Sequence, residues 1–123
     1  MAVKILVVDD DQQTREALAS ILWRAGYEVT LLESGKHLEK NLLTHTYAAA
    51  VIDYHLPERN GLEIARSIKE SLPSCPVLLM SSETPPQQIS DEKTTPVNRF
   101  LSKPFSKAAF LQVIAELCPL AKE

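Results

Sequence analysis

The uninterrupted apolar run from Ala48 to Ile52, which ends in the single carboxylate of Asp53, most constrains the fold of this chain. A strand with one face in water alternates apolar and polar residues, and this run shows no alternation. It therefore predicts a strand buried on both faces, as in a parallel sheet with helices on either side. Asp53 would then lie at the carboxyl rim of that sheet, where ligands bind in open α/β folds.

Short apolar runs alternate with amphipathic stretches along the rest of the chain. The expected strands span residues 4–8, 28–32, 48–53, 76–80 and 99–102. The expected helices span residues 12–25, 36–43, 60–72 and 106–117. This β–α alternation predicts an α/β fold with a doubly wound, five-stranded parallel sheet. The first, third and fourth strands are the most apolar and should be central, which favours the flavodoxin-like order 2-1-3-4-5.

Residues 83–98 do not follow this alternation of apolar runs and amphipathic stretches. The segment holds three prolines, many polar residues, and Ile89 as its single large apolar residue before Val97. A packed surface helix needs apolar residues recurring three and four positions apart. We expect one or two helical turns at most, over about residues 86–92, and irregular chain beyond them. The fourth helix should thus be short or irregular.

Length, charge and hydropathy exclude several classes of protein. The 123 residues suit one domain, spanning 1–123. The net charge of −3 gives no basic field for nucleic acid. No apolar run approaches the roughly 20 residues of a membrane helix, and the N-terminus lacks a signal-peptide pattern. We expect a cytoplasmic protein without membrane contact, in which Cys75 and Cys118 are reduced, at least half-buried thiols.

Polar residues follow four of the expected strands and should meet at one rim, because parallel strands end at the same edge of a sheet. They are Asp9-Asp10-Asp11, Asp53, Ser81-Ser82 and Lys103-Pro104. Clustered carboxylates repel one another unless a cation joins them. Oxygen ligands without His or Cys side chains indicate a hard cation such as Mg²⁺. A hydroxyl and an ammonium group suit a bound phosphoryl group.

At these positions the chain resembles the receiver domain of two-component response regulators, of the chemotaxis-regulator type. The matching residues are Asp9-Asp10, Asp53, Pro57, Gly61, Ser81 and Lys103-Pro104. The resemblance covers essentially the whole chain, and only residues 83–98 fit poorly. It implies a phosphoprotein in a phosphorelay, in which Asp53 is the nucleophile that accepts a phosphoryl group.

The resemblance also implies a Mg²⁺ site. Asp10 would bind the ion directly, Asp9 would hold a metal-bound water, and Asp53 would be a further ligand. The backbone carbonyl of His55 would complete the set of protein ligands. Phosphoryl transfer depends mainly on alignment and charge neutralisation, which a metal ion and a lysine can supply.

Further roles are implied for three residues near the phosphoryl group. Lys103 would pair with the Asp53 carboxylate and then with phosphoryl oxygens, and Ser81 would donate its hydroxyl to the phosphoryl group. Phe100 would be the switch aromatic that turns inward as Ser81 shifts. Simple edge-strand packing remains an alternative for Phe100.

The implied partners are a sensor histidine kinase or phosphotransfer protein, which donates the phosphoryl group, and an unknown downstream protein. Neither direct nucleic-acid binding nor membrane binding is expected. The domain would be a signalling domain, not an enzyme, although it would assist its own phosphoryl transfer and loss. Both a stand-alone regulator and a receiver belonging to a longer protein are compatible with the sequence.

Two other classes share parts of this pattern. An FMN-binding electron carrier of the same topology would place Gly, Ser and Thr after the first strand, where this chain has three acids. A phosphatase of the haloacid dehalogenase type needs Asp-x-Asp-x-Thr there. Asp9 and Asp11 supply the two acids, but Gln13 occupies the next required position, and 123 residues leave no room for a cap domain. Asp11 is better explained as the N-cap of the first helix, and Trp23 on that helix should be half-buried.

Overall fold

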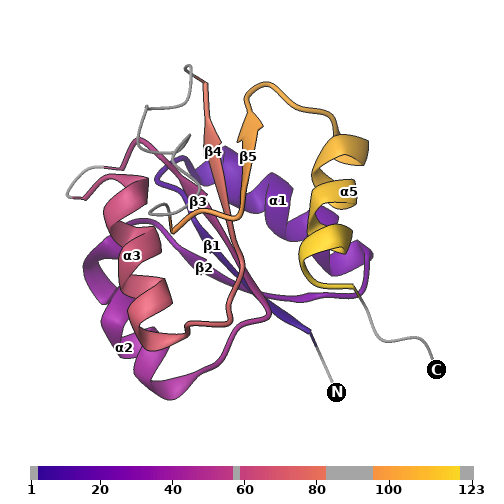
Figure 1. Ribbon diagram of the computed structural model, residues 1–123. Helices are drawn as coiled ribbons and strands as arrows, with labels where there is room; N and C mark the ends of the chain where they lie inside the picture. The colour runs from indigo at the N-terminus through magenta and orange to yellow at the C-terminus, as the bar shows by residue number, and fades with distance from the viewer. Residues whose placement is uncertain (1–2, 57–58, 83–95, 120–123) are drawn as a thin grey trace.

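The computed structural model describes residues 3–56, 59–82 and 96–119. Its centre is a five-stranded parallel sheet in the order β2-β1-β3-β4-β5 (Figure 1). The strands are β1 (Lys4–Val8), β2 (Glu28–Leu32), β3 (Ala49–Asp53), β4 (Val77–Ser81) and β5 (Arg99–Ser102). The predicted strand order and the doubly wound, flavodoxin-like class are confirmed.

Helices cover both faces of the sheet. They are α1 (Gln12–Arg24), α2 (Leu38–Thr44), α3 (Gly61–Ser71) and α5 (Lys107–Leu117), and the 3-10 helix η1 (Gly35–His37) leads into α2. The predicted helix bounds agree with these to within two residues. The predicted short or irregular fourth helix concerns residues 83–95, which lie outside the described part of the chain. Residues 96–98, just beyond it, are not helical.

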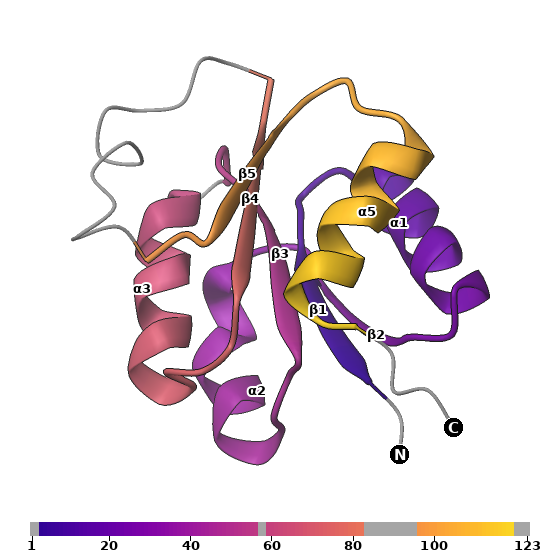
Figure 2. The ribbon, with the colours of Figure 1, turned by 45° about the vertical axis from the view of Figure 1, so that its right-hand side comes forward.

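Two hydrophobic cores flank the sheet. Helices α2 and α3 pack on one face and α1 and α5 on the other (Figure 2). Every residue of β3 and β4 is buried, whereas the edge strands β2 and β5 consist of half-buried and exposed positions. Apolar burial on both faces, worth about 25 cal/mol per Å², explains why the most apolar runs are central. Val97 is buried in the core beneath α3.

Capping residues define where the helices begin. Asp11 accepts a hydrogen bond from the Thr14 N–H, as predicted for the N-cap of α1. Asn60 and Glu63 form a reciprocal capping box at the start of α3. Such side chains satisfy N–H groups that have no partner inside the helix.

Two predictions about individual side chains had different outcomes. Cys75 and Cys118 are free, buried thiols, and burial raises the pKa of each to about 11. The prediction that Trp23 is half-buried is wrong, because its side chain is 74% exposed. Trp23 lies one position after the last buried residue of α1, so the spacing of apolar residues along the helix did not predict how exposed its side chain is.

Among the described helices, none is long and apolar enough to cross a bilayer.

Candidate functional site

The carboxyl ends of β1, β3, β4 and β5 meet at one rim of the sheet. Val8 pairs with Ile52, Asp53 with Met80, and Ser81 with Ser102. The strands therefore end nearly level with one another. The residues that follow or end them come together at this rim, although they are distributed over about 95 positions of sequence.

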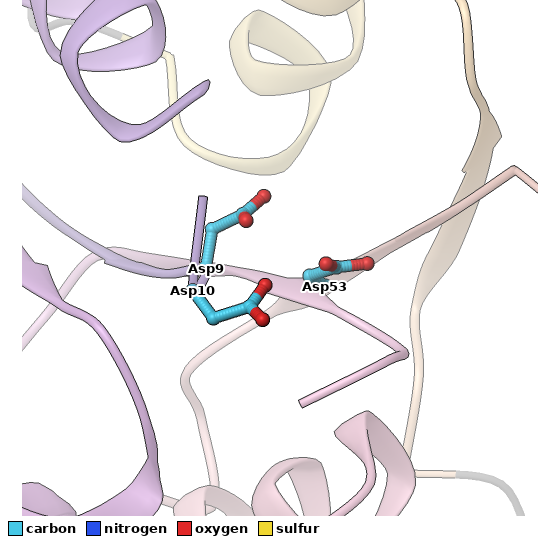
Figure 3. A group of neighbouring side chains, drawn as sticks. All are labelled: Asp9, Asp10 and Asp53. Atoms are coloured by element: carbon cyan, nitrogen blue, oxygen red, sulfur yellow. The ribbon is translucent and has the colours of Figure 1, made fainter. Parts of the chain in front are cut away.

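Asp9, Asp10 and Asp53 form an acidic cluster at the rim (Figure 3). One carboxylate oxygen from each lies within 4.8 Å of the others. Asp9 is completely buried and Asp53 is 7% exposed, whereas Asp10 is exposed to solvent. Like charges this close, with two of them withdrawn from water, destabilise the fold unless positive charge compensates them.

Lys103 supplies part of that compensation. Its Nζ lies 3.4 Å from Asp9 Oδ2 and 3.7 Å from Asp53 Oδ1, so that one ammonium group bridges the two buried acids. The Lys103 N–H donates to the Ser81 carbonyl at 2.8 Å, which fixes the end of β5 against β4. The peptide bond from Lys103 to Pro104 is cis.

The protein raises the pKa of the Asp53 carboxyl group above its ordinary value. Burial is the main cause, and repulsion by Asp9 adds to it. Lys103 and the His55 N–H, which donates to Asp53 Oδ1 at 3.4 Å, act in the opposite direction, and Asp10 has a smaller raising effect. Asp53 is thus a carboxylate whose negative charge is only partly compensated by the protein.

Several hydrogen bonds fix Asp9. Its N–H donates to the Leu32 carbonyl at 3.0 Å, its Oδ1 accepts from the Asp11 N–H at 2.9 Å, and its carbonyl accepts from Arg15 Nη1 at 2.9 Å. Sequence analysis did not identify Arg15. The sequence feature that could have indicated Arg15 is its position in the first turn of α1, from which a long side chain can reach back to the end of β1.

Asp11, Ser81 and Phe100 differ in their relation to the cluster. Asp11 caps α1, and the hydrogen bonds from Thr14 lower the pKa of its carboxyl group. Ser81 ends β4 and is buried at the rim. Phe100 is half-buried in β5 opposite Leu79 and packs against the core beneath α2 and α3. The expected roles of Ser81 and Phe100 stay predictions, and Pro57 lies outside the described residues.

The donor set of the rim fits a hard divalent cation. Three carboxylates and the ammonium group of Lys103, which contacts Asp9 and Asp53, leave two negative charges among these described residues, which one Mg²⁺ would neutralise. Oxygen ligands are those that Mg²⁺ prefers. The same acids would repel the phosphate of a flavin nucleotide at the end of β1, which argues against the electron-carrier alternative.

Comparison with known proteins identifies the same kind of domain. The sequence profile of the response regulator receiver domain matches residues 5–115. The two-component response regulator ORR7 of Oryza sativa subsp. japonica is 33% identical over 116 residues, covering 92% of this chain and 55% of ORR7. The sensory/regulatory protein RpfC of Xanthomonas campestris is 27% identical over 120 residues, covering 94% of this chain and 16% of RpfC.

A solved structure supports the same likeness. The response regulator TrrA of Thermotoga maritima, in complex with Mg²⁺–BeF, is 26% identical and superposes with a TM-score of 0.82. The match covers 94% of this chain and 98% of that structure. By contrast, the chain spans about half the length of ORR7 and about a sixth of RpfC. The likeness therefore concerns the domain and not the whole of these longer relatives.

Proposed function

The chain belongs to the family of response regulator receiver domains, and from this premise we propose that Asp53 accepts a phosphoryl group in a Mg²⁺-dependent phosphorelay. The observation that carries the proposal is the position of Asp53, buried at the end of β3 beside Asp9 and within 3.7 Å of Lys103. Residues 1–123 would act as one receiver domain.

The residues that would hold Mg²⁺ are Asp9, Asp10 and Asp53, with the backbone carbonyl of His55. Asp10 would bind the ion directly and Asp9 would bind it through water. The clustered oxygens of the three acids support this assignment, and TrrA is a relative whose structure contains Mg²⁺. When bound, Mg²⁺ would neutralise charge on the carboxylates and on the phosphoryl oxygens.

The chemical step would be the attack of an Asp53 carboxylate oxygen on the phosphorus of a phosphohistidine. A P–O bond forms, the P–N bond breaks, and the released imidazole takes up a proton. Lys103 would leave its contact with the Asp53 carboxylate to pair with a phosphoryl oxygen, and Ser81 would donate its hydroxyl to another. Buried groups held in position are efficient in such a step because they need little rearrangement.

The proposed partners are a sensor histidine kinase or phosphotransfer protein and a downstream protein that recognises the phosphorylated form. Ser81 and Phe100 would transmit the change by shifting together, biasing arrangements that already exist before phosphorylation. The domain would act in cytoplasmic signalling and not as an enzyme, although it would assist the gain and loss of its own phosphoryl group.

Incubation with Mg²⁺ and acetyl phosphate tests the assignment of Asp53. Intact-mass spectrometry should detect one added phosphate on the wild-type protein and none on Asp53→Ala. Asp11→Ala is the matched control, because it removes a neighbouring acid that caps α1 and lies outside the cluster. It should still be phosphorylated. Equal phosphorylation of Asp53→Ala and wild type would refute the proposal.

A further inference from the structure

The carbonyl of Asp9 belongs to the peptide group that joins the two adjacent acids of the cluster, and Arg15 Nη1 donates a hydrogen bond to it at 2.9 Å. A peptide group is planar. The direction of the Asp9 carbonyl therefore also sets the direction of the Asp10 N–H and the point from which the Asp10 side chain departs. A contact with this carbonyl bears on the positions of both carboxylates.

Arg15 makes this contact where the pairing of β1 with β2 ends. The register runs as far as Val8 opposite Leu32, and the Asp9 N–H still donates to the Leu32 carbonyl. On the helix side, the Arg15 N–H donates to the Asp11 carbonyl at 2.9 Å, within the first turn of α1. Arg15 thus joins the end of β1 to α1 across the chain segment that carries the acidic cluster.

Two effects of Arg15 on a bound cation have opposite signs. The positive charge of Arg15 lies near the cluster and disfavours the binding of a metal cation there through Coulomb repulsion. Its hydrogen bond favours cation binding if it keeps the carboxylates in the arrangement that the ion requires, because partners that orient metal ligands typically change metal affinity 10–100-fold. The direction of the change in Mg²⁺ affinity on removing Arg15 therefore distinguishes the two effects.

We propose that Arg15 is a positioning residue of the Mg²⁺ site, holding the peptide group between Asp9 and Asp10 so that both carboxylates face Asp53. This inference rests on the proposed function, since it takes the acidic cluster to be the Mg²⁺ site. Arg15 acts through Asp9 and has no direct contact with the ion or the phosphoryl group in this role.

The test measures Mg²⁺ binding by calorimetry and backbone amide shifts by NMR, both on the unphosphorylated protein. Arg15→Gln removes the charge and the guanidinium group, and it should raise the Kd for Mg²⁺ roughly 10-fold. In the absence of Mg²⁺, the Asp10 amide resonance should shift. Arg24→Gln is the matched control, with the same change of charge in the exposed last turn of α1, and it should change the Kd less than about twofold.

An unchanged or lower Kd for Mg²⁺ in Arg15→Gln would overturn the inference, because the effect of removing the charge would then equal or exceed any effect of losing the hydrogen bond. Should Arg15→Gln fail to fold, Arg15→Lys decides, since it keeps the charge but lacks the planar guanidinium group. A weaker Mg²⁺ site with a shifted Asp10 amide in Arg15→Lys supports the inference, and an unchanged site overturns it. Absence of Mg²⁺ binding in the wild type would instead refute the proposed Mg²⁺ site on which the inference rests.

Discussion

The three carboxylates of the acidic cluster differ in burial and in the groups that surround them. Asp9 is buried and held by hydrogen bonds at its backbone and side chain. Asp10 is exposed to solvent. Asp53 combines burial with an incompletely compensated charge. A buried carboxylate in this condition is destabilising in the absence of an ion and gains most from a bound cation.

Asp53→Asn should stabilise the metal-free protein at neutral pH. The folded-state pKa of Asp53 is raised, so the folded state binds the proton more tightly than the unfolded state. The resulting stability is present at low pH and is lost as pH rises through the folded-state pKa. The neutral amide avoids this loss and should raise the melting temperature by on the order of 4 °C.

Thermal unfolding with EDTA at neutral pH and at about pH 4 measures this difference. The advantage of Asp53→Asn over wild type should shrink at the acidic pH. Asp10→Asn should also stabilise the protein at neutral pH, though less, because Asp10 is exposed and its charge is better solvated. A wild-type protein more stable than Asp53→Asn at neutral pH would contradict the assigned repulsion.

At the scale of elements, the turn from β3 into α3 fixes where Asp53 lies. The Gly61 N–H donates to the Tyr54 carbonyl at 2.8 Å. A Cβ on Gly61 would lie 2.7 Å from the Asp53 carbonyl oxygen and 2.8 Å from Tyr54 Cα, so the helix start can approach the strand end only without a side chain. Arg59 contacts Glu39 at 2.9 Å and hydrogen-bonds to Ser67, which joins this turn to α2 and α3.

Gly61→Ala should therefore destabilise the fold and displace Asp53. The added methyl group meets backbone atoms, which cannot rotate away, and overpacking of this kind costs about 1–3 kcal/mol. Urea denaturation should show that loss, and phosphorylation by acetyl phosphate should slow. Gly35→Ala is the comparison, because its Cβ would meet side-chain carbons, Ile64 Cδ1 at 3.2 Å and Arg59 Cδ at 3.3 Å, which can shift more easily than backbone atoms. Equal losses of stability in both variants would show that the close approach of Gly61 to the end of β3 does not cause the loss in Gly61→Ala.

At the scale of the whole molecule, the site exists only when both cores are assembled. Its acids come from the ends of β1 and β3, and its ammonium group comes from the end of β5. Helices on both faces hold these strands in register. An unfolded chain cannot gather these groups, so ion binding should be coupled to folding of the complete domain.

Mg²⁺ should accordingly stabilise the protein against unfolding. When free Mg²⁺ is about 100 times its Kd, the free energy of unfolding should rise by about 2.7 kcal/mol. Urea denaturation at rising Mg²⁺ concentration and constant ionic strength measures this increase. Asp10→Ala should lose most of it. An increase of the same size in Asp10→Ala would place the stabilising ion elsewhere on the protein.

The sequence by itself determined the fold class, the strand order and the rim at which the polar residues meet. Apolar runs without alternation indicate strands that are buried on both faces, and Ala49–Asp53 and Val77–Ser81 are such strands. Parallel strands then end at one edge, which brought Asp9, Asp53 and Lys103 together in the prediction and in the structure. The N-cap role of Asp11 followed from local preference alone.

The tertiary structure alone decided which of these groups are buried and what they contact. The position of Lys103 between two acids depends on the register of β5 against β4, which the local sequence of neither strand specifies. The contact of Arg15 with the Asp9 carbonyl depends on how α1 lies beside the end of β1. The exposure of Trp23 depends on the rotation of α1 about its axis. Burial and contacts of this kind depend on how the helices and strands pack together, which the spacing of residues in the sequence does not specify.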